Sequence, residues 1–164
     1  MTLRTYSRLE LAENQLRAAI GLFVSGGDRF SVISLAGAAD VLLSRLVLNT
    51  GQENFTESAL RREMERGGQP VTREEFGKGM NDTLFINQIK HMDNNDDEYI
   101  EFDPEECALG AILKAIANYA TLGGRNRDFV LAFMAWVKLN LDPEKYNVDC
   151  DPNWAPSAQP HLER

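Results

Sequence analysis

The fold of this protein follows from one stretch of its sequence, VISLAGAADVLLSRLVL, which spans residues 32–48. Apolar residues occur on almost every side of a helix built from this stretch, and such a helix is surrounded by other elements. Ser31 precedes it as a good N-cap, with Phe30 and Leu35 at the positions of a hydrophobic staple. The sequence therefore predicts a central, buried helix that begins at Ser31 and ends at Gly51.

Five further helices are predicted, because apolar residues recur at helical spacing between recognisable start and stop signals. They are expected at about residues 7–25, 57–66, 72–91, 103–122 and 127–141. Thr56 is the expected N-cap of the helix at 57–66, and Thr72 with Glu75 forms a capping box at the start of the helix at 72–91. Gly77 and Gly79 each weaken this last helix by about 1 kcal/mol relative to alanine, so a break is expected near them.

The 164 residues are enough for one domain with a core of its own. We therefore predict an all-α, single-domain helical bundle of five to six helices, which occupies residues 1–142. Asp103 is the clearest helix start within it, because it is an N-cap residue followed at once by Pro104. Residues 143–164 contain four prolines and little apolar periodicity, which predicts a mobile C-terminal tail.

The composition disfavours several classes of protein. A net charge of −8 argues against a main task of binding a phosphate backbone, so nucleic acid stays an open question rather than an expected partner. Two cysteines, Cys107 and Cys150, make no disulfide framework, and we expect a cytoplasmic protein with Cys107 as a buried thiol. The first residues lack a signal peptide, and no apolar run approaches the roughly 20 residues that span a bilayer, so no membrane partner is expected. No cofactor motif is found, and none is expected to bind.

The best candidate for a functional site is the segment Asn87-Gln-Ile-Lys90-His91-Met-Asp93, at the end of the predicted helix 72–91. Asn87 and His91 are four residues apart and share one face of that helix. One interpretation is structural, with His91 and Lys90 stabilising the C-terminal end of the helix. The other is functional: Asn87, Lys90, His91 and Asp93 line a polar pocket, in which His91 binds a ligand or acts as general acid or base.

The segment from Asp93 to Glu106 contains eight carboxylates and no lysine or arginine. A block of like charges usually faces water, so one interpretation is a solvated loop and helix start. The other is a cation site, because three side chains stand at ligand positions of an EF-hand loop: Asp93, Asn95 and Asp97. Glu98 occupies the place of the turn glycine and Pro104 that of the bidentate glutamate, so the sequence offers only a weak cation site.

Four arginines form the one basic cluster that the sequence displays: Arg61, Arg62, Arg66 and Arg73. They lie on the predicted helix 57–66 and shortly after it. A solvated helix face and an anion-binding face are both consistent with this pattern.

The order of motifs resembles a family of uncharacterised bacterial proteins that are all-helical. The motifs are, in chain order, Ala12-x-x-Gln15-Leu16, Ser31-Val32-Ile33, Asn87-x-x-Lys90-His91-x-Asp93, an acidic stretch, Phe102-Asp103-Pro104 and Phe133-Met-Ala-Trp136. The resemblance covers about residues 8–140. It implies a helical bundle and no particular activity.

More distantly, the chain is similar to HEPN-type domains, which are up-and-down helical bundles and are often dimeric. That similarity implies a homodimer and, in many members, action on RNA or nucleotides through an arginine and a histidine at short spacing. His91 matches the histidine. The arginine is missing, since Leu84, Phe85 and Ile86 stand where it would be, and ribonuclease activity by this route is not expected.

Three classes of function follow from these features. The favoured hypothesis is a non-catalytic, HEPN-like interaction module that forms a homodimer and binds a protein or nucleotide partner. The alternative is an enzyme acting on RNA or a nucleotide, with His91 as acid or base, Asn87 orienting it and Lys90 contacting phosphate. A second alternative is a cation-responsive protein that uses the acidic segment 93–106.

Overall fold

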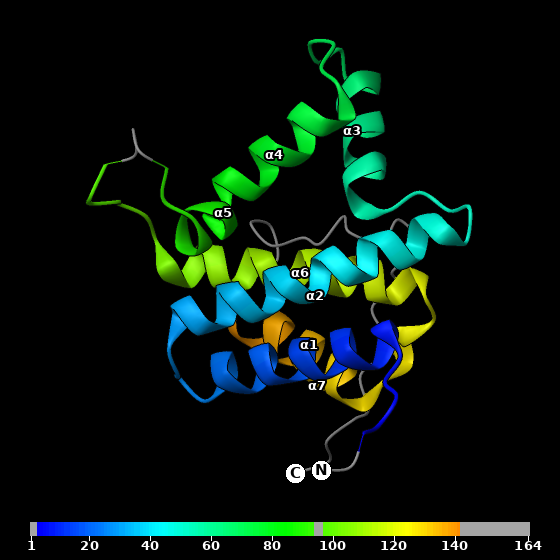
Figure 1. The fold of residues 1–164 in the computed structure, drawn as a ribbon, viewed down its shortest axis with the longest axis vertical. Helices are drawn as coiled ribbons and strands as arrows, with labels where there is room; N and C mark the ends of the chain where they lie inside the picture. Colours follow the sequence, from blue (N-terminus) through cyan, green and yellow to red (C-terminus); the bar gives the residue numbers. More distant parts are fainter. Residues whose placement is uncertain (1–2, 94–96, 142–164) are drawn as a thin grey trace.

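A computed structural model of the chain describes residues 3–93 and 97–141. Within these residues the regular elements are all helices, so the predicted all-α fold is confirmed (Figure 1). In chain order they are α1 (Arg8–Val24), α2 (Arg29–Asn49), α3 (Phe55–Glu65), α4 (Arg73–Thr83), α5 (Ile86–Lys90), α6 (Pro104–Thr121), the short 3-10 helix η1 (Gly124–Asn126) and α7 (Asp128–Asn140). The tail predicted from residue 143 lies outside the described residues.

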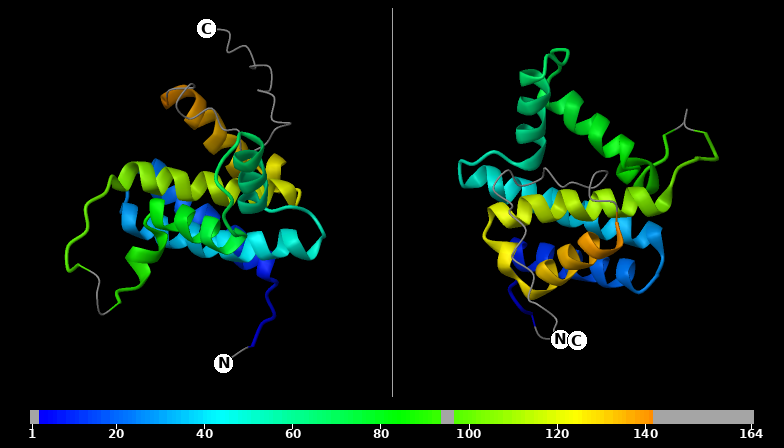
Figure 2. Two further views of the ribbon diagram at one scale, coloured as in Figure 1. Left: turned by 90° about the horizontal axis from the view of Figure 1, so that it is seen from above. Right: turned by 180° about the vertical axis from the view of Figure 1, so that it is seen from behind.

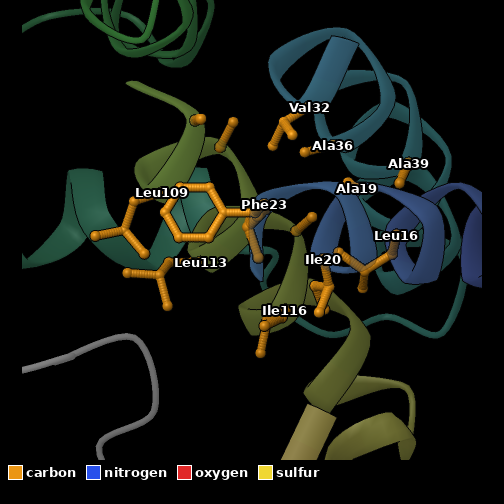
Figure 3. Packing of buried hydrophobic residues seen from close by; sticks show 14 of the residues in the cluster. Leu16, Ala19, Ile20, Phe23, Val32, Ala36, Ala39, Leu109, Leu113 and Ile116 are labelled. Atoms are coloured by element: carbon orange, nitrogen blue, oxygen red, sulfur yellow. The ribbon is translucent and has the colours of Figure 1, made fainter. Parts of the chain in front are cut away.

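Four of these helices, α1, α2, α6 and α7, form the body of the protein. α2 packs against α1 on one side and α6 on another, while α7 lies against α1 and η1 (Figure 2). Figure 3 shows the centre of this core, where Leu16 and Phe23 of α1 and Val32 of α2 lie around Leu109 and Ile116 of α6. The apolar stretch 32–48 is therefore a core helix, and it shares this position with α6, in which 12 of 18 residues are buried.

Within the described residues, α2 is also long and apolar enough to cross a membrane, judged by length and composition alone. This test allows two charged residues, and α2 contains Asp40 and Arg45 within its apolar stretch. The sequence expectation was stricter, because it asked for an apolar stretch without charges. Much of α2 is buried against other helices, and core helices of soluble proteins pass the same test.

Two predicted helix starts are confirmed by their hydrogen bonds. The Thr72 hydroxyl accepts from the Glu75 backbone N–H at 3.2 Å, and the Glu75 carboxylate accepts from the Thr72 backbone N–H at 2.9 Å. The Asp103 carboxylate accepts from the backbone N–H groups of Glu105 at 2.9 Å and Glu106 at 3.1 Å. Both signals are local in sequence, which is why they could be predicted without tertiary information.

Two other predicted N-caps are wrong. α2 begins at Arg29 rather than after Ser31, and its cap is Asp28, which accepts from the Ser31 backbone N–H at 2.7 Å. α3 is capped by Asn54 rather than Thr56. In each case a better acceptor stands two or three residues earlier, and that turn is held by a contact from α6, such as the ion pair of Arg29 with Glu105.

The predicted helix 72–91 is two helices in the structure. The break expected near Gly77 or Gly79 is wrong, because α4 runs through both glycines and the chain turns at Phe85 instead. Phe85 has a φ of 55°, in the left-handed region that residues other than glycine rarely adopt. Its ring stacks on Phe102 with 4.5 Å between the ring centroids. A tertiary contact thus selects the breakpoint, against the local glycine signal.

The helices α3 and α4 form a hairpin that rises from the body (Figure 1). The start of α3 and the end of α4 lie at the body, and the turn between them lies at the far tip (Figures 1 and 2). Neither helix contains a fully buried residue. The hairpin therefore contributes little to the core. Interactions other than burial of its own side chains must hold it against the body.

Candidate functional site

Two oppositely charged side chains are buried between α2 and α6. Asp40 is 4% exposed and Lys114 is 5% exposed, and the Lys114 ammonium donates to the Asp40 carboxylate. Asn118, which is fully buried, donates from Nδ2 to the other carboxylate oxygen of Asp40 at 2.7 Å. Burial of two charges costs several kcal/mol for each ion and is tolerated only with good pairing and further hydrogen bonds, which this arrangement supplies.

The same polar network holds both helices of the hairpin. At the start of α3, the Phe55 backbone N–H donates to Asn118 Oδ1 at 2.8 Å. On α4, the Asn81 side-chain oxygen accepts from the Lys114 ammonium at 3.1 Å. The base of the hairpin is therefore attached to α6 through polar contacts centred on Asp40, in addition to the packing of Leu84 against the core.

A cavity of about 710 Å³ lies between the hairpin and α6. Its walls are mostly apolar and include the following residues: Phe55 from α3, Phe76, Met80 and Leu84 from the α4 region, and Leu113 from α6. Among the described residues, three polar side chains line it: Lys114 from α6, Glu75 near the start of α4 and Thr83 at its end. An apolar recess with few polar groups is the usual form of a small-molecule site.

Two glycines shape the cavity. A side chain at Gly110 would bring a Cβ atom within 2.6 Å of the Leu84 side chain, so glycine here allows Leu84 to lie against α6. A Cβ atom at Gly79 would meet nothing within 4 Å, because this side of α4 faces open space. Gly79 is therefore a place where a larger side chain would enter the cavity without a clash.

The segment Asn87–Asp93 does not converge on one pocket. Asn87 donates from Nδ2 to the Asp82 carboxylate at 2.9 Å and so holds the junction of α4 and α5. His91 stands at the C-cap position of α5, where its backbone N–H donates to the Asn87 carbonyl at 2.9 Å. Its side chain is exposed, and the described residues offer its imidazole no hydrogen bond. Asp93 is exposed as well and precedes residues that the structure does not describe.

Lys90 is the member of that segment that approaches the buried network, from an exposed position. Its ammonium lies 3.2 Å from the place that a Cβ atom on Gly37 would take, one turn before Asp40 on α2. Burial lowers the pKa of Lys90, and the nearby Asp40 carboxylate opposes this effect. Gly37 is needed for this approach, since a Cβ atom there would also lie 2.7 Å from Ile86 of α5.

The acidic segment is used in part for structure. Asp103 caps α6, and Glu105 forms an ion pair with Arg29 that also includes a hydrogen bond of 3.0 Å from Nη2. Of the proposed calcium ligands, Asp93 and Asp97 are exposed and Asn95 lies outside the described residues. Among the residues that are described, no group of three or more histidine, cysteine or acidic side chains is placed to hold a metal ion.

Two of the four arginines of the predicted basic cluster, Arg61 and Arg73, pair with acidic side chains. Arg61 pairs with Glu53 at 3.2 Å and with Glu65 at 3.0 Å, and Arg73 pairs with Glu57 at 2.9 Å. These partners offset the positive charge of the helix face, which favours the solvated interpretation over the anion-binding one.

A second polar cluster joins α1 to α6 and α7. Glu13 accepts from the Tyr119 hydroxyl at 2.7 Å, from Arg127 at 2.6 Å and from Arg17 at 2.8 Å. Burial and the hydrogen bond to the Glu13 carboxylate raise the pKa of Tyr119 to about 12. The hydrogen bond from Tyr119 in turn lowers the pKa of Glu13. This cluster locks the body together, and its members are too far apart in sequence to form a visible motif.

Cys107 is buried, as the sequence predicts, and its thiol lies 3.8 Å from the Thr83 carbonyl oxygen. Burial raises the pKa of this thiol, with Asp103 and Glu106 adding to the effect. A thiol of raised pKa is a poor nucleophile, so Cys107 serves in packing at the junction of α4 and α6.

Comparisons with known proteins give no family for this chain. No family model matches the sequence, and no curated protein or solved structure matches it. The site must therefore be interpreted from its own geometry. Three residues of the site were missed by sequence analysis: Asp40, Lys114 and Asn118. Each is a polar residue within the apolar stripe of a helix. Such a residue could have been recognised, since a buried polar group needs a partner.

Proposed function

We propose that the protein is a non-catalytic binding module, and that its ligand enters the cavity between the α3–α4 hairpin and α6. The observation that carries this proposal is the cavity itself, with a volume of about 710 Å³ and mostly apolar walls. Small-molecule sites commonly measure about 300–1,000 Å³ and combine apolar walls with a few polar groups. In this proposal the cavity is the binding site of the module, and the ligand is a compact apolar molecule.

The chemistry of the cavity supports binding better than catalysis. Lys114, the lysine that lines it, is engaged with Asp40 and Asn81, so it has the role of a fixed donor. His91, the acid or base of the enzyme hypothesis, does not line the cavity among the described residues. A nucleotide would need a cluster of cations for its phosphates, whereas Arg61 of α3 is paired with two glutamates.

The test uses N-phenyl-1-naphthylamine, an uncharged apolar dye that fluoresces when it leaves water. We expect the wild-type protein to bind it at one site, and Gly79→Leu to weaken binding at least about tenfold by filling the cavity. Leucine also favours a helix over glycine by about 1 kcal/mol, so this variant should lose binding without losing stability.

Gly21→Leu is the matched control. Gly21 lies within α1, a Cβ atom there meets nothing within 4 Å, and it is remote from the cavity lining. The control should gain similar stability and bind the dye as the wild type does. Equal dye binding by wild type and Gly79→Leu would refute the proposal, and so would the absence of any binding.

We also propose the homodimer that the sequence suggests. Phe30 and Val41 of α2 are 53% and 59% exposed, which leaves apolar surface for a second copy of the chain. Light scattering after size exclusion, at tens of micromolar protein, should give twice the mass of one chain. The mass of a single chain at that concentration would exclude the dimer.

A further inference from the structure

We infer that the ligand of the cavity is an apolar molecule with a single carboxylate, and that the Lys114 ammonium receives this carboxylate. The inference rests on the proposed function, because it assigns the chemical class of the ligand to the same cavity. It is carried by three features: an ammonium group with one N–H bond that no described residue accepts, the net charge of the residues around this group, and the position of the Glu75 carboxylate in the cavity wall.

The donor is the ammonium group of Lys114. An ammonium group has three N–H bonds, and the protein accepts from this one at Asp40 and at Asn81. Among the described residues no further acceptor contacts it, and its side chain lines the cavity. A buried donor without an acceptor is costly, so an acceptor on the ligand would satisfy the third N–H.

The charge around Asp40 favours an anionic acceptor. Two ammonium groups, those of Lys114 and Lys90, interact with the single Asp40 carboxylate. The other neighbour of Asp40 is the neutral side chain of Asn118. Two positive charges and one negative charge leave a net charge of +1 on this cluster, in which Asp40 and Lys114 are buried and Lys90 is exposed. A monoanion balances this charge, an alcohol leaves it unbalanced, and an amine increases it.

Among the described residues, Glu75 is the one carboxylate that lines the cavity, and it orients the ligand. It is exposed near the tip of the hairpin, where Thr72 donates to it from the backbone N–H at 2.9 Å and from the hydroxyl at 2.8 Å. These hydrogen bonds lower the pKa of Glu75, so it stays anionic. Asn81, which contacts Lys114, is about 9 Å further along α4. Repulsion from Glu75 therefore directs a ligand carboxylate toward Lys114, and the apolar part toward Phe76 and Val71.

The first experiment uses wild-type protein and three probes with the same alkyl chain: octanoate, 1-octanol and octylamine. Displacement of the uncharged dye measures the affinity of each. Octanoate should bind at least about tenfold more tightly than octanol, because a charge-assisted hydrogen bond is about twice as strong as a neutral one. Octylamine should bind most weakly. Equal binding of octanoate and octanol, or tighter binding of octylamine, would overturn the inference.

These outcomes separate the inference from the proposed function. If the dye binds and Gly79→Leu abolishes this binding, the cavity is a ligand site even where octanoate shows no preference. If neither the dye nor any probe binds, the proposed function fails and the inference fails with it.

The second experiment changes the charges. The double variant Asp40→Asn with Lys114→Met removes both buried charges together, which avoids leaving one uncompensated. Its affinity for octanoate should fall more than its affinity for octanol, so its preference for octanoate should fall severalfold. An unchanged preference would show that Lys114 does not receive the carboxylate.

Lys90→Met keeps the test decisive if the double variant does not fold, because Lys90 is on the surface side of the network and has an exposed side chain. It should weaken octanoate binding severalfold and leave octanol binding unchanged. Lys78→Met is its control, since Lys78 is an exposed lysine of α4 outside the cavity lining. Equal octanoate affinities of the two variants would refute the assigned role of the charge.

Discussion

The body of the protein and the α3–α4 hairpin are stabilised in different ways, although both consist of helices with similar end signals. In the body, side chains such as Leu16, Ile33 and Phe133 are almost completely buried in one shared core. In the hairpin no residue is fully buried, and its base is attached by hydrogen bonds to Asn118 and Lys114. The stability of the body is thus spread over many buried apolar residues, whereas the attachment of the hairpin depends largely on a few polar contacts.

This difference explains why the cavity lies beneath the hairpin. A region with few buried apolar groups opens at low free energy, and binding sites are commonly found in such regions. Since the polar network fixes only the base of the hairpin, α4 can stand away from α6 and leave space between them. Substitutions in the body and substitutions in the hairpin should therefore differ in how much they lower the free energy of unfolding and in which helices they affect.

The largest effect is expected in the body. Phe133→Ala should lower the free energy of unfolding by about 4 kcal/mol, because it removes a large buried side chain and leaves a cavity. Met80→Ala in the hairpin should cost only about 1 kcal/mol, since Met80 is half-buried at the cavity wall. Chemical denaturation measures both values. Similar losses for the two variants would show that the hairpin belongs to the core.

The next effect tests the attachment of the hairpin. Lys114→Met should cost about 3 kcal/mol, because it leaves the Asp40 carboxylate buried without its main partner. Hydrogen exchange should also speed up in α3 and α4 more than in α1 and α7. The exposed Lys78→Met serves as control, with an expected change within about 0.5 kcal/mol. A uniform increase of exchange in all helices would contradict a local role for the network.

The smallest effect concerns a contact inside the body and depends on pH. The pKa of Tyr119 is raised to about 12, above the value of about 10 for tyrosine in an unfolded chain. The stability that Tyr119 contributes is therefore complete below about pH 10 and is lost as the pH rises toward about 12. Relative to Tyr119→Phe, wild type should lose about 1 kcal/mol over this range, a value discounted for partial solvent screening.

Denaturation curves at a series of pH values measure this loss, and a titration of tyrosinate absorbance locates the pKa. Because Tyr119 links α6 to Glu13 of α1, hydrogen exchange in the hairpin should be the same in wild type and Tyr119→Phe when both are measured at the same pH. Wild type and Tyr119→Phe with parallel pH profiles would show that Tyr119 titrates as an ordinary tyrosine.

Much of the fold could be predicted from local signals. The capping box of Thr72 and Glu75 and the N-cap at Asp103 are confirmed, because each depends on residues within one helical turn. Ser31 and Thr56 failed as caps, since Asp28 and Asn54 stand just before them and the tertiary structure selects between neighbouring candidates.

The candidate site was less predictable. The segment around His91 was chosen for its polar residue types, and of its members Lys90 alone reaches the buried network. Asp40 and Lys114 are 74 positions apart, and each interrupts an apolar helix stripe. A polar residue within the buried apolar stripe of a helix indicates that it has a hydrogen-bonding or charged partner. The stripe alone does not identify that partner.

The amino-acid sequence by itself determined that this chain is a bundle of helices, where α1, α6 and α7 begin and end, and that residues 32–48 lie in its core. These properties depend on periodicity and on end signals, which act over a few residues. Tertiary structure alone decided that the chain breaks at Phe85, that Asp40 pairs with Lys114, and that a cavity lies beneath the hairpin. Each of these depends on contacts between distant segments, whose energies outweigh local preferences only after the helices have packed.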